Sequence, residues 1–245
     1  GFGNYAKMFS SPNFWPPLTN TLLLFCLIPL CLLLCLGLAL IMDQRLRGTA
    51  VFRTLILLPF ALSFVVTGTV WAYMYRPTGG VLNSFLGLLG VDVSAAMKNG
   101  SLMWASSNRT IMLTIIIAMV WQFSGYVAVI FLAAIKNVPV NVINAAKLDG
   151  AYMPRIYWKL IIPQLKGAMG SCITILAMYA LRSFDFIVSL VGYTTSSAWT
   201  LPIWMYNEAF QSNNFAYSAA ISCFLLALVL VLILPLTYWT NRRKA

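Results

Sequence analysis

Five apolar segments, each long enough to cross a lipid bilayer, constrain this chain more than any other feature of its sequence. A membrane-spanning helix needs about 20 consecutive apolar residues. Because unpaired backbone groups are costly in lipid, such segments are expected to be helical. We therefore predict an all-α, multi-pass transmembrane helical bundle over residues 1–245, a single domain with short interfacial and cytoplasmic helices. The five predicted spans are Leu18–Met42, Thr54–Tyr75, Ile111–Ile135, Gly167–Val191 and Phe215–Trp239.

The composition disfavours most enzymes. The 245 residues are 61% hydrophobic and 9% charged, and they include no histidine and only five acidic residues. A histidine-based catalytic triad or metal site cannot be assembled from them. The five cysteines lie inside apolar stretches, where cysteine behaves as a small buried hydrophobe, so we predict no disulfide and no metal site. These cysteines are Cys26, Cys31, Cys35, Cys172 and Cys223.

The positive charges predict which loops are cytoplasmic. Short loops rich in Lys and Arg stay on the cytoplasmic side. Eleven of the 16 basic residues follow the first, third and fifth spans, which places the C-terminus inside the cell. Five crossings that end inside place Gly1 outside, and residues 1–17 lack the pattern of a signal peptide. We therefore expect a further helix upstream in the natural protein.

Both long connections are predicted to contain short helices. In the outer loop, apolar residues between Gly80 and Gly90 predict an amphipathic helix that lies flat at the membrane surface. In the cytoplasmic loop, residues 137–166, Pro139 suits the first turn of a helix that Gly150 ends. That short helix either only connects two spans or binds in a groove on another protein.

The cytoplasmic loop resembles the EAA loop of binding-protein-dependent ABC importers. The matching residues are Asn144-Ala145-Ala146, Asp149-Gly150-Ala151 and Ile162-Pro163. Further similarities to the sugar-type permeases, the maltose and glycerol-phosphate type, extend over nearly the whole chain. They include Gly3-Asn4-Tyr5, Asn20-Thr21, Phe52-Arg53-Thr54, Leu58-Pro59, Gly80, Asn83, Gly90, Trp121-Gln122, Gly125, Phe131-Leu132-Ala133 and Ser183-Phe184-Asp185.

Two positions depart from the family pattern. Asn144 occupies the place of the usual glutamate, which removes a charge but keeps hydrogen-bonding capacity. Gly192-Tyr193-Thr194 stands where many members have Gly-Gly-Pro, so the turn there is expected to differ. Members of the family also have one more N-terminal helix, in agreement with the topology argument.

The resemblance implies a permease subunit that forms half of an alternating-access path for a sugar or related polyol. Its implied partners are a second permease subunit, two ATP-binding subunits and an extracellular solute-binding protein, in the plasma membrane of a prokaryote. The coupling helix would contact an ATP-binding subunit through Asn144, Ala145, Ala146, Asp149, Gly150 and Ala151. The sequence has no GxxxxGK[ST] motif, so it predicts no cofactor in this chain, with ATP and Mg in the partner.

Charged and aromatic residues on the spans are candidates for the translocation path. Arg182 and Asp185 are three residues apart in a predicted span, where they either pair with each other or line a polar path. Sugars need hydroxyl-pairing groups and aromatic faces. We select Gln122 and Tyr179 from a set that also includes Trp121, Tyr126 and Phe184.

Three other functions remain open from the sequence alone. An ion-coupled secondary carrier usually shows an inverted repeat, and none is visible here. An integral-membrane enzyme would need a cluster of catalytic groups, and a structural or sensory subunit would carry no substrate. The sequence also leaves the identity of the sugar or polyol open.

Overall fold

The computed structural model describes residues 2–44, 48–76, 79–90, 104 and 110–242, with side chains up to 238. The regular structure in this part of the chain is helical throughout. Three helices there are long and apolar enough to cross a membrane, and the number rises to five if each of two bent helix pairs is one span. The predicted all-α, multi-pass architecture is confirmed. The three unbroken candidates are Trp15–Asp43, Ile111–Lys136 and Phe215–Tyr238.

The chain divides into two compact units that use alternating parts of the sequence. The first unit contains residues 1–27, 62–119 and 179–229. The second unit contains residues 28–61, 120–178 and 230–245. The long helices α8 (Ile111–Lys136), α12 (Lys166–Leu181) and α15 (Phe215–Arg242) contribute residues to both units.

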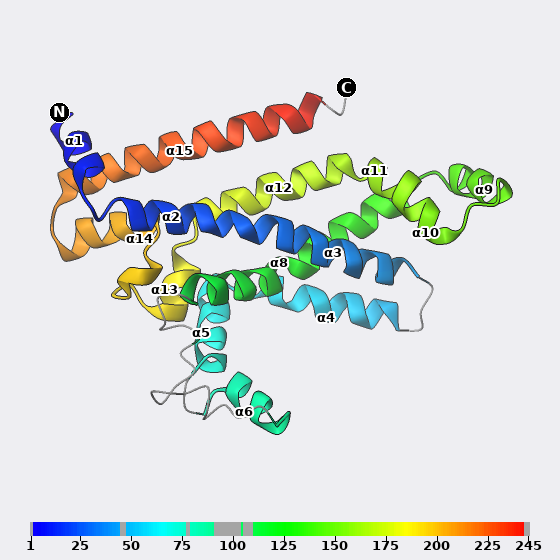
Figure 1. The fold of residues 1–245 in the computed structure, drawn as a ribbon, viewed down its shortest axis with the longest axis horizontal. Helices are drawn as coiled ribbons and strands as arrows, with labels where there is room; N and C mark the ends of the chain where they lie inside the picture. Colours follow the sequence, from blue (N-terminus) through cyan, green and yellow to red (C-terminus); the bar gives the residue numbers. More distant parts are fainter. Residues whose placement is uncertain (1, 45–47, 77–78, 91–103, 105–109, 243–245) are drawn as a thin grey trace. The chain divides into compact units, whose positions relative to one another are not determined.

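The first unit has a core of large aromatic and aliphatic side chains. Trp204 packs edge-on against Tyr217, with ring centroids 5.8 Å apart, and both are buried. Figure 1 shows α1 beside the start of α15, where Asn4 Nδ2 donates to the Ala216 carbonyl at 3.0 Å. The helices of this unit are α1 (Gly3–Ser10), α2 (Trp15–Leu23), α5 (Phe64–Met74), α6 (Val81–Leu88), the start of α8 (Ile111–Lys136), the end of α12 (Lys166–Leu181), α13 (Asp185–Val191), α14 (Leu201–Tyr206) and the start of α15 (Phe215–Arg242).

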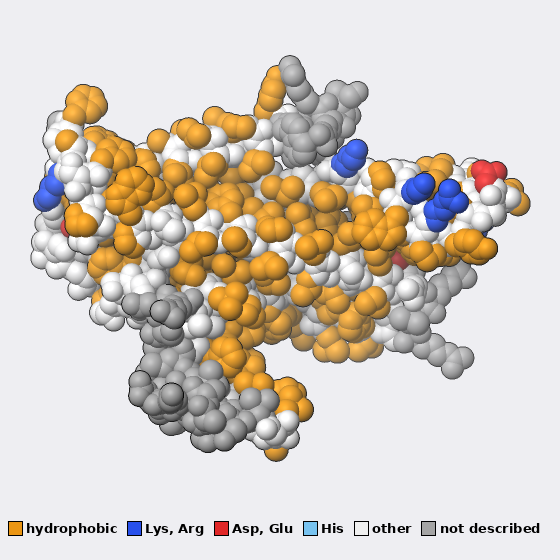
Figure 2. Space-filling model, in the orientation of Figure 1, with side chains coloured by type: hydrophobic (Ala, Val, Ile, Leu, Met, Phe, Trp, Pro, Cys, Tyr) orange, Lys and Arg blue, Asp and Glu red, His pale blue; other side chains and the backbone are white. Residues whose placement is uncertain are grey.

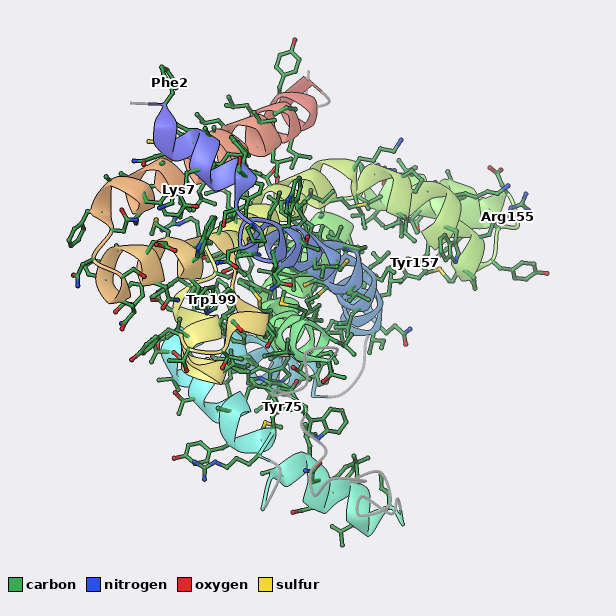
Figure 3. The ribbon with its side chains drawn as sticks, turned by 60° about the vertical axis from the view of Figure 1, so that its left-hand side comes forward. Phe2, Lys7, Tyr75, Arg155, Tyr157 and Trp199 are labelled. Atoms are coloured by element: carbon green, nitrogen blue, oxygen red, sulfur yellow. The ribbon has the colours of Figure 1, made fainter. Side chains whose placement is uncertain are left out.

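The Asn20-Thr21 pair connects α2 to the segment that precedes α14. Asn20 Nδ2 donates to the carbonyls of Ser197 and Trp199, each at 2.9 Å. Thr21 Oγ1 accepts from the Leu201 N–H at 3.0 Å, which satisfies one backbone donor at the start of α14. Trp199 is labelled in Figure 3. Buried backbone groups must find partners, so these two polar residues have a structural role in the fold.

The outer-loop helix forms as predicted. The helix α6 begins after Gly80, whose added Cβ would collide with the Arg76 carbonyl, so only glycine fits there. Asn83 is one of the residues that resemble the sugar-type permeases. Its side chain donates to the Arg76 carbonyl at 3.3 Å and accepts from Trp104 Nε1 at 2.8 Å. The exposed side of α6 is apolar, as an interfacial helix requires. That side includes Val81, Phe85 and Leu88.

The second unit is built around the close approach of α4 and α8. An added Cβ at Gly125 on α8 would overlap the backbone carbonyl of Ile56 on α4. Next to this contact, the rings of Phe60 and Tyr126 stack with centroids 4.3 Å apart. The elements of this unit are α3 (Leu27–Asp43), α4 (Thr49–Ala61), the remainder of α8, α9 (Val140–Leu148), α10 (Met153–Ile156), a π-helical turn (Tyr157–Ile161), α11 (Ile162–Gln164), most of α12 and the end of α15.

The second predicted span, Thr54–Tyr75, is not one straight helix. It bends by 99° between α4 and α5. Ser63 lies at the break in an extended conformation, and its Oγ accepts from the Val66 N–H at 3.3 Å to cap α5. A serine that caps a new helix start is enough to interrupt an apolar segment, because its hydroxyl satisfies a backbone donor that a continuous helix would use.

The fourth predicted span, Gly167–Val191, is also interrupted. Helix α12 ends at Leu181 and α13 begins at Asp185. Between them, Ser183 Oγ donates to the Ala180 carbonyl at 3.0 Å and so competes with the helical backbone pattern. Arg182 and Asp185 therefore do not lie on one continuous helix, and the prediction of a single unbroken span over Gly167–Val191 was wrong.

Candidate functional site

Helix α9 projects from the second unit with most of its surface accessible. It follows α8 after a short turn in which the Asn137 and Val138 amides bond back to carbonyls of α8. None of its nine residues is buried, and only Ile143 and Ala146 are half-buried. Figure 1 shows α9 beyond α10, at the tip of this segment. A helix that buries so little of itself in its own chain has its surface available for another molecule.

The Asp149-Gly150-Ala151 sequence closes α9 with a complete Schellman motif. Gly150 has φ +78°, a conformation that glycine adopts without steric cost. The Gly150 amide donates to the Lys147 carbonyl and the Ala151 amide donates to the Ala146 carbonyl, each at 3.0 Å. This pair of bonds satisfies carbonyls that a helix end otherwise leaves open. The helix end thus explains why glycine stands at position 150.

The segment after the loop bends because of Pro163. Proline has no N–H to donate to the preceding helical turn. The backbone adopts a π-helical turn over Tyr157–Ile161, in which the Ile162 amide donates to the Tyr157 carbonyl five residues earlier. The segment Met153–Gln164 then meets Lys166–Leu181 at an angle of 61°. The Ile162-Pro163 pair thus lies between the π-helical turn and the bend at Leu165.

Tyr157 connects the loop to the end of α3. Its Oη donates to Asp43 Oδ2 at 2.9 Å, a charge-assisted hydrogen bond between segments 114 residues apart. Both side chains are half-buried. Figure 3 labels Tyr157 and Arg155 on this segment. The bond gives α9 and its connection a fixed base on a membrane-spanning helix.

The predicted coupling residues lie together on α9 and its C-terminal turn. Asn144, Ala145, Asp149 and Gly150 are exposed, whereas Ala146 and Ala151 are half-buried against the motif they close. Leu148, which was not among the predicted coupling residues, is 90% exposed at the end of α9. An exposed leucine at a projecting tip is a strong candidate contact.

Basic side chains surround the base of the projecting segment. Figure 2 shows Lys and Arg side chains gathered at the α9–α10 end of the second unit, near an acidic side chain. The exposed basic residues from the end of α8 to the start of α12 are Lys136, Lys147, Arg155, Lys159 and Lys166. This surface favours anionic partners.

The four candidate path residues are divided between the units. Gln122 lies on α8 in the second unit and is 1% exposed. Tyr179, Arg182 and Asp185 lie in the first unit. Tyr179 is half-buried and packs edge-on against Phe64, with centroids 5.5 Å apart.

Arg182 and Asp185 are both exposed on the interruption between α12 and α13. Within the described part of the chain, no ion pair joins them, so the structure does not contain the mutual pair considered from the sequence. Phe184, which lies between them, packs against Tyr206 with centroids 5.0 Å apart. Exposed charges in a break between two helix segments are free to meet water or a polar solute.

Cysteines come together in the second unit. Cys31 and Cys35 are buried with their Sγ atoms 3.6 Å apart, and Cys35 Sγ donates to the Ser124 carbonyl at 3.1 Å. All five cysteines are free thiols. Among the described residues, no group of three or more His, Cys, Asp or Glu side chains could hold a metal ion.

Comparison with known proteins identifies the family. Residues 34–244 match the family described as binding-protein-dependent transport system inner membrane component. The chain belongs to this family. The permease is 43% identical to a probable ABC transporter permease protein of Pyrococcus horikoshii. The match covers 99% of this chain and 82% of that protein. The permease is 36% identical over 98% of its length to a xylose/arabinose import permease protein of Haloferax volcanii, covering 74% of that protein.

The permease fold also matches a solved structure. A chain of a bacterial ABC transporter involved in the import of the acidic polysaccharide alginate superposes with a TM-score of 0.84 and 22% identity. The match covers 99% of this permease and 84% of that chain. At this identity the similarity establishes the shared fold. The all-helical inner-membrane permease predicted from the sequence is confirmed.

Proposed function

We propose that this permease imports a sugar or related polyol, forming half of an alternating-access path driven by ATP hydrolysis in partner chains. The observation that carries the proposal is α9, a helix with no buried residue, closed at Gly150 and anchored at its base by Tyr157. Such a helix suits a groove on another protein. The xylose/arabinose permease supports the sugar class of the substrate.

The proposed assembly contains a second permease subunit, two ATP-binding subunits and an extracellular solute-binding protein. Two packings of the same helices would open the path to opposite sides, with each nucleotide state favouring one. A solved bacterial alginate ABC transporter is in complex with an alginate pentasaccharide-bound periplasmic protein, which supports the solute-binding partner of this proposal. ATP and Mg would be bound by the partner, and the C-terminus would be cytoplasmic.

The proposed path residues differ in accessibility. Arg182 and Asp185 are exposed and suit contact with a polar solute, and Tyr179 offers a half-buried ring. Gln122 is buried, so its contact with solute requires a conformation in which α8 opens to the path. Gln122 and Tyr179 would supply a hydrogen bond and an aromatic face to a sugar.

The test is to replace Leu148 by Asp and to co-purify the permease with its ATP-binding subunit. Leu148 is 90% exposed at the tip of α9, where a new charge would oppose burial in an apolar groove. We expect at least about a 30-fold loss of affinity, the effect of a binding hot spot of about 2 kcal/mol. Substrate uptake should fall in parallel.

The matched control is Leu88→Asp. Leu88 is 86% exposed on α6, so the same substitution is made at a similarly exposed leucine of another helix. It should leave binding of the ATP-binding subunit unchanged. Equal retention of that subunit by Leu148→Asp and by the unmodified permease, with full uptake, would refute the proposed role of α9.

A further inference from the structure

An apolar cavity lies at the base of the projecting segment. Its volume is about 320 Å³, within the range of small-molecule pockets. One wall comes from the end of α3 and the other from α10 and the π-helical turn. The lining is almost entirely apolar, so it is not suited to a sugar. The lining residues are Leu40, Gln44, Met153, Pro154, Tyr157 and Trp158.

The position of the cavity along a membrane-spanning helix is defined by the Tyr157–Asp43 hydrogen bond. Asp43 is the last residue of the apolar helix that begins at Trp15, so the bond is formed where the span ends. Trp158, next in the sequence, is 72% exposed. Tryptophan and lysine are enriched at this depth, where an apolar body meets lipid and a polar tip meets the headgroups. The cavity therefore opens at the level of the lipid headgroups and upper acyl chains.

The charges near the cavity favour an anion. Arg155 follows the lining residue Pro154, Lys159 follows Trp158, and both cations are exposed. Asp43 lies beside the lining residue Tyr157, and its carboxylate accepts the Tyr157 hydroxyl. Anionic lipids of the cytoplasmic leaflet attract such basic segments.

We propose that this cavity binds an acyl chain of an anionic phospholipid from the cytoplasmic leaflet, whose phosphate contacts Arg155 and Lys159. The proposal rests on the proposed function in one respect, because that function places the loop on the cytoplasmic side. The bound lipid would fill the space between the end of α3 and residues 153–158, which connect α9 to α12. It would thereby support the segment that carries α9.

The experiment uses the assembled transporter in phosphatidylcholine nanodiscs. These contain one of two lipid probes, phosphatidylglycerol or phosphatidylcholine, each with a diazirine near the end of one acyl chain. Cross-linked peptides are mapped by mass spectrometry. We expect the phosphatidylglycerol probe to label Leu40 or residues 153–158, and the phosphatidylcholine probe to label them at least fivefold less. Each cation near an anionic surface changes affinity by about fivefold.

Two kinds of variant separate the acyl-chain contact from the charge contact. Met153→Trp fills the cavity from a partly exposed position, and Leu40→Trp fills it from α3; each should abolish labelling. Arg155→Gln combined with Lys159→Gln should remove the preference for phosphatidylglycerol. Lys7→Gln, which removes a charge from α1 of the first unit, should leave labelling unchanged.

Equal labelling by the two probes, or labelling that Met153→Trp leaves intact, would overturn the proposal. Labelling of the isolated permease that disappears in the assembled transporter would also overturn it, because an ATP-binding subunit would then occupy the cavity. These outcomes are independent of the Leu148→Asp experiment, which measures partner binding without a lipid probe. Failure of the lipid site and failure of the coupling role are thus distinguishable.

Discussion

At the scale of single residues, Gly150 shows how one backbone conformation controls the end of the projecting helix. Its φ of +78° lies in the left-handed region, and an added Cβ would find no atom within 4 Å. The effect of a side chain at this position is therefore backbone strain alone, about 1–2 kcal/mol. A smaller entropic gain from restricting the unfolded chain offsets part of it.

We predict that Gly150→Ala loosens α9 without disturbing the rest of the permease. A net cost of about 1 kcal/mol should raise amide hydrogen exchange within α9 about fivefold, as measured by mass spectrometry on peptides that cover residues 137–156. Gly87→Ala is the control, because Gly87 lies in α6, also has open space around it and has no positive φ. Alanine there should stabilise α6 by up to about 1 kcal/mol and leave exchange in α9 unchanged. Unchanged exchange in α9 of Gly150→Ala would contradict the strain argument.

Patterns of single residues in the sequence predicted backbone conformation better than side-chain contacts. Gly150 was predictable, since glycine after a run of helix formers signals a helix end. The bond between Tyr157 and Asp43 was not predictable, because no local pattern indicates a hydrogen bond across 114 residues. The exposure of Leu148 was not predictable for a different reason. An apolar residue in an apolar sequence carries no signal until the structure shows that it is exposed.

At the scale of elements, two glycines set how closely helices approach. Gly68 on α5 faces α13, where an added Cβ would lie 2.7 Å from the Phe186 carbonyl oxygen. Gly125 on α8 faces α4, and its added Cβ would overlap the Ile56 carbonyl. Small residues let membrane helices approach closely, and backbone atoms cannot rotate away as a side chain can. Each glycine therefore defines one helix contact within its unit.

We predict that Gly125→Ala destabilises the permease by about 1–3 kcal/mol, the usual cost of overpacking. For a chain of this size that corresponds to a fall of about 2–4 °C in Tm per kcal/mol, measured by thermal unfolding of the purified permease. Gly167→Ala is the matched control, because Gly167 is also helical but has no atom within 4 Å of an added Cβ. It should keep or raise Tm. Equal Tm values for the two variants would show that α4 and α8 separate without cost.

The apolar pattern predicted the presence of the spans but not their bends. Segment length and composition report how much surface must meet lipid, which is a sum over many residues. The break at Ser63 depends on one hydroxyl that caps α5, and the break at 182–184 involves the hydroxyl of Ser183. A single polar residue changes the mean hydropathy of a 20-residue window very little. The two breaks could therefore not be predicted from the length and composition of the apolar segments.

At the scale of the whole molecule, the distribution of charge predicts which side of the membrane each loop faces. Eleven of the 16 basic residues follow the first, third and fifth spans, which predicts that α9 is cytoplasmic and α6 is outside. Leu148 on α9 and Leu88 on α6 are 90% and 86% exposed. Because the two side chains are almost equally accessible within the protein, any difference in their labelling reports the membrane.

We predict that a membrane-impermeant maleimide labels Leu88→Cys in intact cells and labels Leu148→Cys only after the membrane is opened. Cys26 and Cys223 are exposed on the protein surface, so both are replaced by Ala to remove background. When the permease is expressed without its ATP-binding subunits, labelling after permeabilisation should be similar at the two sites, within about twofold, because their exposed fractions in this chain are similar. Labelling of Leu148→Cys from outside would reverse the topology, and α9 could then no longer reach an ATP-binding partner in the cytoplasm.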